Sequence, residues 1–140
     1  MNTQTAHATC VAVGDRAVLL TGASGTGKST IALELMAYGA SLVSDDQVVL
    51  MAESDVIVAS APPTIAGLIE ARGLGVLNAQ VKNSATIVMV VDLDFLTADR
   101  IPAPRSVTYL GCDLPLFHRS DGVSLAPAIL QFLRAGASDR

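Results

Sequence analysis

The ten residues TGASGTGKST, at positions 21 to 30, constrain this chain more than any other stretch. Gly22, Gly27, Lys28 and Ser29 have the spacing G-x-x-x-x-G-K-[ST] of a phosphate-binding P-loop. In that loop, glycines let the backbone turn with positive φ, so that successive N–H groups face one anion. A helix that begins directly after the loop adds partial positive charge. The motif therefore requires the order strand, loop, helix.

The residues on both sides of the motif fit that order. The apolar run at 17–22 predicts a buried strand, and residues 29–38 predict a helix that ends at Gly39. The alternative is a solvated Gly/Ser turn that matches by chance. Lys28 is expected to reach the β- and γ-phosphates of ATP, and the Ser29 hydroxyl to bind Mg²⁺. The expected phosphate-binding residues are Gly22, Ala23, Ser24, Gly25, Thr26, Gly27, Lys28, Ser29 and Thr30.

Composition excludes several classes of protein. The 140 residues are 51% hydrophobic with a net charge of −4, which predicts one domain, 1–140, and argues against a nucleic-acid-binding face. No apolar run reaches the roughly 18 residues of a membrane span. The N-terminus lacks the layout of a signal peptide, so we expect a cytoplasmic protein. Cys10 and Cys112 are expected to be reduced thiols rather than a disulfide.

The pattern of apolar and turn residues predicts a mixed α/β sheet with flanking helices. Residues 62–80 are expected to be irregular with a helical turn in the middle, and residues 136–140 to be a frayed tail. The C-terminal helix is expected to bend at Pro127. The predicted strands and helices are hairpins at 7–13 with 17–22 and at 47–52 with 56–62, single strands at 40–46, 84–94 and 106–111, and helices at 29–38 and 123–137.

Two adjacent acids follow the strand after the motif. Asp45 and Asp46 are expected at the carboxyl edge of the sheet, where open α/β sheets bind ligands. One carboxylate can hold Mg²⁺ through water while the other accepts a hydroxyl proton. The alternative is a solvated turn or a helix cap, because Asp pairs are common there.

Two further positions are candidates. The first predicted hairpin places His7 opposite about Ala23, at the mouth of the loop, although a lone histidine often has no function. In the stretch EARGLG, Glu70 can be a second magnesium ligand and Arg72 can meet phosphate. An ordinary loop with a surface ion pair is an equally good interpretation of that stretch.

Together these motifs resemble the catalytic domain of the HPr kinase/phosphorylase family. That family carries a histidine at the start of a hairpin, then G-x-S-G-x-G-K-S, a V-x-D-D strand end and L-I-E-x-R-G-L-G. The counterparts here are His7, the P-loop stretch, LVSDD and LIEARGLG. The resemblance implies that Lys28 and Ser29 serve phosphate and magnesium, that Asp46 deprotonates a substrate serine, that His7 assists it and that Glu70 binds Mg²⁺. Arg100, in ADRI, loosely resembles a family arginine linked to catalysis.

The resemblance implies an ATP- and Mg²⁺-dependent protein-serine kinase that acts on HPr or an HPr-like phosphocarrier. Family members form hexamers, and this chain is similar to the short, single-domain form of some proteobacteria. The family's arginine-rich phosphorylase loop is here LFHRSDG, where Arg119 stands beside His118 and Asp121, so we expect weak or absent phosphorylase activity. The alternatives are a P-loop kinase of small molecules and a nucleotide-sensing regulator with little turnover.

Overall fold

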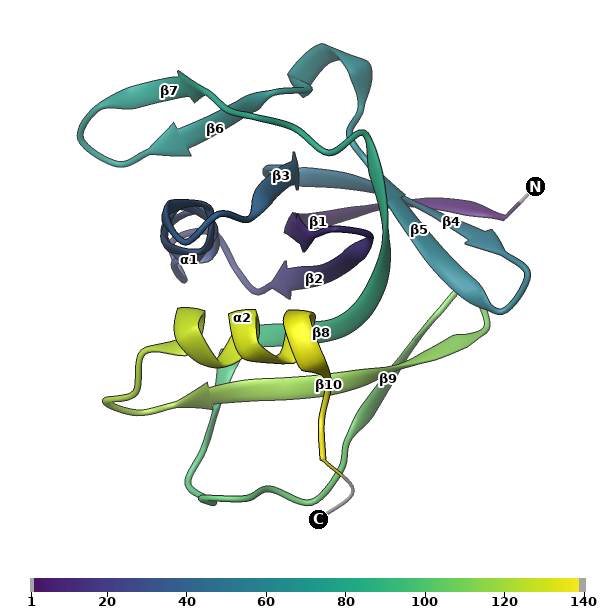
Figure 1. Ribbon diagram of the computed structural model, residues 1–140, viewed down its shortest axis with the longest axis vertical. Helices are drawn as coiled ribbons and strands as arrows, with labels where there is room; N and C mark the ends of the chain where they lie inside the picture. The colour runs from purple at the N-terminus through teal and green to yellow at the C-terminus, as the bar shows by residue number, and fades with distance from the viewer. Residues whose placement is uncertain (1, 139–140) are drawn as a thin grey trace.

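The computed structural model describes residues 2–138. The main sheet has eight strands, two helices lie against it, and β6 and β7 form a separate two-stranded sheet (Figure 1). The predicted mixed α/β class is therefore confirmed. In chain order the elements are β1 (Thr3–Val13), β2 (Arg16–Thr21), α1 (Lys28–Ala37), β3 (Ser41–Ser44), β4 (Gln47–Glu53), β5 (Val56–Ser60), the 3₁₀ turn η1 (Pro63–Ile65), β6 (Leu68–Ala71), β7 (Gly75–Asn78), β8 (Ser84–Thr97), β9 (Ser106–Tyr109), β10 (Cys112–Ser120) and α2 (Leu125–Ala135).

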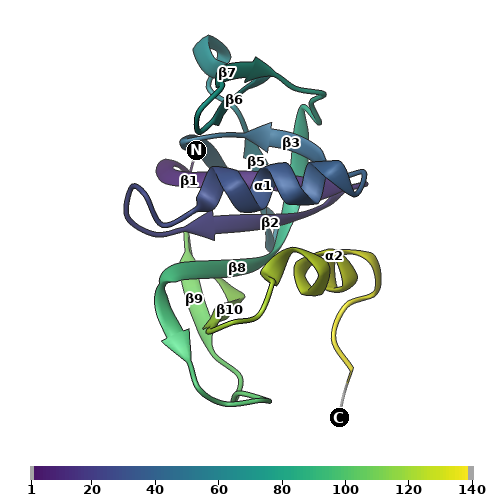
Figure 2. The same ribbon diagram turned by 90° about the vertical axis from the view of Figure 1, so that its left-hand side faces the viewer.

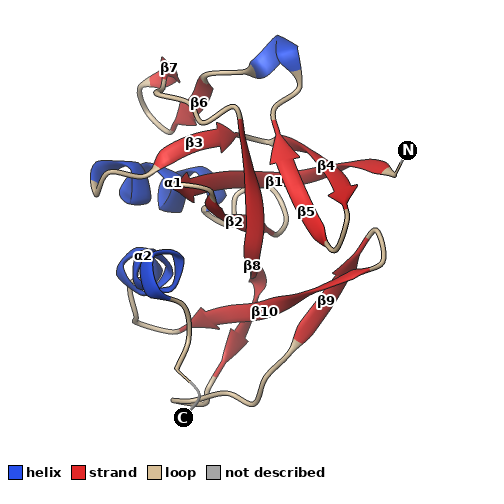
Figure 3. Cartoon of the chain, turned by 45° about the vertical axis from the view of Figure 1, so that its right-hand side comes forward, coloured by secondary structure: helices blue, strands red, loops and turns tan. Residues whose placement is uncertain are grey.

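The main sheet closes on itself. Strand β1 pairs with β2 and β4, β4 with β5, β5 with β8, and β8 with β2, so these strands form a ring (Figure 3). Because side chains alternate across a strand, one set fills the ring and the other faces outward. The inner set includes Cys10, Leu19, Leu50 and Ile57, all fully buried. The ring thus has a core of its own.

The outward set forms a second core under the helices. Figure 2 shows α1 and α2 on the same side of the sheet. Leu20 of β2 and Val91 of β8 cluster there with Leu35 of α1 and Leu133 of α2. Packing of α1 on this core fixes the direction in which the loop between β2 and α1 must run. None of the helices formed by residues 2–138 is long and apolar enough to cross a membrane.

Both predicted hairpins are present. Strands β1 and β2 pair from Val13 with Arg16 to Ala8 with Thr21, and β4 pairs with β5. The predicted single strands correspond to β3, β8 and β9, and the helix predicted at 29–38 is α1.

Two segments were predicted wrongly. Residues 62–80 contain a helical turn, η1, at the start of the segment rather than in its middle, and LIEARGLGVLN is a β-hairpin rather than irregular chain. Gly73 in the turn and Gly75 at the start of β7 have φ of 90° and 116°, which glycine adopts readily, while Ile69 and Ala71 are buried. Residues 112–120, to which no strand was assigned and which include most of the expected loop LFHRSDG, form strand β10. Pro115 is tolerated because pairing with β8 begins only at Leu116.

The C-terminal helix is continuous from Leu125 to Ala135, so the bend expected at Pro127 is absent. Pro127 is the third residue of α2, where a backbone N–H has no partner within the helix and its loss costs little. Residues 136–138 form neither helix nor strand, and positions 139 and 140 of the expected tail lie outside the described residues.

Candidate active site

The glycine-rich loop between β2 and α1 has the backbone that the motif predicts. Gly22, Gly25 and Gly27 have φ of 137°, 84° and 103°. A side chain at Gly22 has no room, since an added Cβ would lie 2.9 Å from the Thr26 hydroxyl and 3.4 Å from a carboxylate oxygen of Asp94. The loop therefore depends on glycine for both conformation and space.

Lys28 is a buried cation inside this loop. Its side chain is 7% exposed, and Nζ donates to the carbonyls of Gly22, at 2.7 Å, and Ala23, at 3.1 Å. Within residues 2–138 no carboxylate lies within salt-bridge distance of this ammonium group. Burial of a charge without a counter-ion is costly, so the loop is arranged to receive an anion.

Asp94 holds the same loop from the other side. The Ala23 N–H donates to Asp94 Oδ1 at 2.9 Å, and the Asp94 N–H donates to Asp92 Oδ1 at 3.0 Å. No role was predicted for these acids. Their place beside the P-loop follows from the pairing, because β8 is parallel to β2 with Thr21 opposite Asp92, and the carboxyl ends of parallel strands meet at one edge.

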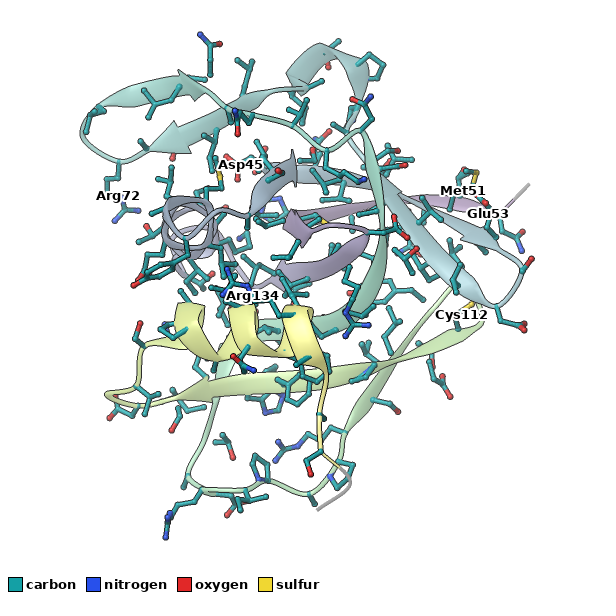
Figure 4. All side chains as sticks on the ribbon, viewed as in Figure 1. Asp45, Met51, Glu53, Arg72, Cys112 and Arg134 are labelled. Atoms are coloured by element: carbon teal, nitrogen blue, oxygen red, sulfur yellow. The ribbon has the colours of Figure 1, made fainter. Side chains whose placement is uncertain are left out.

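Asp45, at the end of β3, is buried at 6% exposure and accepts three hydrogen bonds. Oδ1 accepts from the hydroxyls of Thr9 and Ser29, both at 2.8 Å, and Oδ2 accepts from the Glu70 N–H at 3.0 Å. Figure 4 shows Asp45 between β3 and the β6–β7 hairpin. The carboxylate thus joins the P-loop serine to the hairpin.

Asp46 has a different environment. Its side chain is 70% exposed, and one oxygen lies 3.5 Å from Nδ1 of His7. Its φ is 72°, and the Gln47 N–H donates to the Asp45 carbonyl at 2.8 Å. This i→i+2 bond around a positive φ is the pattern of a γ-turn of the rare, strained kind. Strain of this sort is concentrated at functional sites.

His7 lies on β1 as expected, but it pairs with a different strand from the one predicted. The β1–β2 register would place His7 opposite Gly22, but that pairing ends at Ala8, and His7 pairs with Gln47 of β4. The predicted position of the imidazole beside the P-loop residues is nevertheless right, because His7 lines the same cavity.

The candidate residues surround one cavity of about 360 Å³. Arg72 points from the hairpin turn toward α1 (Figure 4). Thr9, which the sequence analysis did not identify, also lines this space. The lining residues are His7, Thr9, Ser24, Gly25, Gly27, Lys28, Ser29, Thr30, Asp45, Asp46, Glu70 and Arg72.

Some expected residues lie elsewhere. Gly22, Ala23 and Thr26 belong to the loop but not to the cavity lining, and Arg100 is exposed in the segment between β8 and β9. Arg119 is on β10, where its Nε is buried without a hydrogen-bond partner among the described residues. Within residues 2–138 no three His, Cys, Asp or Glu side chains are grouped to hold a metal by themselves.

The chain is similar in sequence to a known protein family. Residues 1–105 match the family model "HPr Serine kinase C-terminal domain". The chain is 38% identical over 102 residues to the HPr kinase/phosphorylase of Lacticaseibacillus casei strain BL23, and 40% identical over 100 residues to that of Bacillus cereus strain B4264. These matches cover 67% and 66% of this chain but 32% of each relative, so the chain spans about a third of their length.

A solved structure extends the likeness. The Hpr(Ser) kinase/phosphatase of Coxiella burnetii is similar with a TM-score of 0.78 and 26% sequence identity. The alignment covers 94% of this chain and 88% of the other. Since the family model accounts for most of the chain and the fold agrees, the chain belongs to the HPr serine kinase C-terminal domain family.

Proposed function

We propose that this chain is an ATP-dependent protein-serine kinase that phosphorylates HPr or an HPr-like phosphocarrier. The observation that carries the proposal is the buried Lys28 ammonium group, which donates to two neutral carbonyls of a glycine-rich loop. A triphosphate is the anion that such a loop is built to receive. The names of the relatives supply the substrate class.

The residues present fit a nucleotide with Mg²⁺. Ser29, Asp45 and Glu70 provide hydroxyl and carboxylate oxygens, which are the ligands that a hard cation prefers. Few protein ligands are needed, because Mg²⁺ in such sites keeps waters and binds phosphate oxygens. When bound, Mg²⁺ would neutralise charge on the phosphates.

The two acids suit different tasks. Asp45 is buried and oriented by three donors, which fits a fixed carboxylate beside the metal. Asp46 is exposed and accessible to a second protein, which fits the base that accepts the serine proton. His7, 3.5 Å away, can orient the Asp46 carboxylate. Lys28 and the loop N–H groups stabilise charge on the transferred group.

We also propose that phosphorylase activity is weak. Attack by inorganic phosphate needs several fixed donors, and arginine supplies them best. Arg72 is the one arginine among the described residues that line the cavity. Arg119 and His118, from the stretch that resembles the family's phosphorylase loop, lie on β10 and do not line the cavity.

A labelling experiment tests the proposal against its alternatives. The chain is incubated with γ-labelled ATP, Mg²⁺ and a purified HPr-like protein, and separately with a pool of small metabolites. We expect label on serine of the protein. Label on a metabolite would support a small-molecule kinase, and tight nucleotide binding without transfer would support a regulator. The hexameric assembly, the cytoplasmic location and a role for Arg100 stay predictions.

A further inference from the structure

We propose that Thr9 is a positioning residue that couples the metal-side acid Asp45 to the proton-accepting acid Asp46. The inference rests on the proposed function, since it assigns a task within that site. Thr9 is fully buried, and its hydroxyl donates to Asp45 Oδ1 at 2.8 Å. The Asp46 N–H lies 3.5 Å from the same hydroxyl oxygen.

The direction of these contacts is determined by the chemistry of the groups. A hydroxyl has one proton and two lone pairs, and an ionised carboxylate only accepts. The Thr9 proton therefore goes to Asp45, and a lone pair of Thr9 faces the Asp46 N–H. One buried hydroxyl thus touches the side chain of the first acid and the backbone of the second.

The topology puts Thr9 at the position where this matters. Strand β1 pairs with β3 up to Cys10 opposite Ser44, and with β4 from His7 opposite Gln47. Between these pairings β1 faces the γ-turn, and the Ala8 N–H donates to the Asp46 carbonyl at 3.1 Å. Thr9 therefore supports the turn at the break between the two strands.

The turn needs such support because it is strained. Asp46 has a φ of 72°, a region that non-glycine residues seldom adopt. Conformations of this kind persist only where the surroundings hold them. Loss of the Thr9 hydroxyl would free the turn, and with it the Asp46 carboxylate beside His7.

The hydroxyl also acts on the metal side. Thr9 and Ser29 both donate to Oδ1 of Asp45. With its proton committed to Asp45, the Ser29 oxygen can present its lone pairs to a cation. Removal of the Thr9 donor lets the carboxylate rotate, so the orientation of Ser29 is lost as well.

The test compares Thr9→Val, which has the same shape without the hydroxyl, with Thr9→Ser, which keeps it. Thr5→Val removes a hydroxyl from an exposed position of the same strand and is the matched control. ATP binding is measured by calorimetry with Mg²⁺ and with EDTA, and kcat and KM by transfer to an HPr-like protein. Thermal unfolding of each variant is recorded.

In Thr9→Val we expect kcat to fall about 10–100-fold, the effect usual for residues that orient metal-site ligands. The Mg²⁺ concentration for half-maximal activity should rise, and ATP affinity in EDTA should not change. Thr9→Ser and Thr5→Val should behave as wild type. If Thr9→Val does not fold, Thr9→Ala is compared with Thr9→Ser in its place.

Three results would overturn the proposal. Unchanged kcat and magnesium dependence in folded Thr9→Val or Thr9→Ala would show that the hydroxyl positions nothing. Equal impairment of Thr9→Ser and Thr9→Val would assign the effect to packing. A higher KM with unchanged kcat would assign Thr9 to substrate binding. If the wild type binds ATP but transfers nothing to the carrier, the proposed kinase fails, while magnesium-dependent ATP binding still tests the role of Thr9.

Discussion

At the scale of single residues, neighbouring acids differ because their backbone and burial differ. Asp45 directly follows β3 and is 6% exposed, whereas Asp46 has a φ of 72° and is 70% exposed. From spacing alone, the sequence indicated two roles for Asp45 and Asp46 but not which residue has which role. The hydrogen bonds from Thr9, Ser29 and Glu70 identify Asp45 as the fixed carboxylate.

Asp46→Asn should remove the carboxylate that accepts the serine proton and leave the rest of the site intact. We expect a loss of about 10²–10⁴-fold in kcat, with ATP affinity retained. Stability should change by less than about 0.5 kcal/mol, because asparagine tolerates positive φ and the site is exposed. Steady-state kinetics and thermal unfolding are the measurements.

Asp45→Asn provides the contrast. Asparagine brings an N–H₂ donor to a position where the Thr9 and Ser29 hydroxyls and the Glu70 N–H already donate. We therefore expect the unfolding free energy to fall by about 1–3 kcal/mol. Magnesium-dependent ATP binding should weaken too. If Asp46→Asn proves the less stable protein and binds MgATP the more weakly, the roles of the two acids are reversed.

The Cys10 thiol gives the protein a pH dependence unrelated to catalysis. Burial inside the ring raises the pKa of this thiol above its ordinary value of 9.0. Above pH 9.0 the unfolded chain loses this proton and the folded chain keeps it, so stability should fall as pH rises, by up to about 1.4 kcal/mol per pH unit.

Urea unfolding of wild type and Cys10→Ala below and above pH 9.0 tests this expectation. The pKa of Tyr109 is also raised from 10.0, by burial and then by the charge of Asp92, so part of the slope should persist in the variant. Equal slopes in both proteins would mean that Cys10 contributes nothing.

At the scale of elements, local patterns identified most of the structure. The apolar runs at β1, β2, β4, β5 and β8 and the helix after the P-loop were predictable, because their burial periodicity is visible in the residues themselves. The β6–β7 hairpin and β10 were missed. Glycines in and next to the turn obscured the hairpin, although its pairing is local. Pro115 and the polar residues toward both ends of β10 obscured that strand, whose pairing with β8 is non-local.

The end of β8 should influence the P-loop through Asp94. Asp94→Ala removes the acceptor of the Ala23 N–H, so the carbonyls that hold Lys28 become mobile. We expect about 10-fold weaker ATP binding, from the loss of one charge-assisted hydrogen bond at an exposed position. Calorimetry measures the affinity.

Asp99→Ala, which removes an exposed acid just beyond β8, is the matched control. Equal ATP affinity in wild type and Asp94→Ala would show that the loop keeps its shape without this carboxylate.

The β6–β7 hairpin should contribute charge to the metal site. Glu70→Gln keeps the backbone N–H bond to Asp45 and removes only the negative charge. We expect a higher Mg²⁺ requirement and unchanged affinity for metal-free ATP, because an amide offers only a neutral oxygen to a hard cation. Activity is titrated against Mg²⁺. If activity depends on Mg²⁺ concentration as in the wild type, Glu70 does not bind the metal and belongs to an ordinary surface loop.

At the scale of the whole molecule, the closed ring brings the site together. Residues from β1, the P-loop, the end of β3 and the β6–β7 hairpin meet at one cavity, although they are spread from His7 to Arg72. The P-loop and the acids were predictable because their spacing carries the chemistry. Thr9 and Asp94 were not predicted, since a threonine inside a strand and an acid at a strand end acquire meaning only from the partners that pairing brings to them.

Transfer of phosphate to a purified HPr-like protein tests the central claim most directly. Wild type, Lys28→Ala and the Thr5→Val control are compared with ATP and Mg²⁺, and the phosphorylated position is mapped by mass spectrometry. We predict one phosphoserine on the carrier, formed by wild type and the control, and lost in folded Lys28→Ala because the cation stabilises charge on the transferred phosphate. Serine phosphorylation at the wild-type rate by Lys28→Ala, or ATP turnover without any phosphoserine on the carrier, would contradict the account.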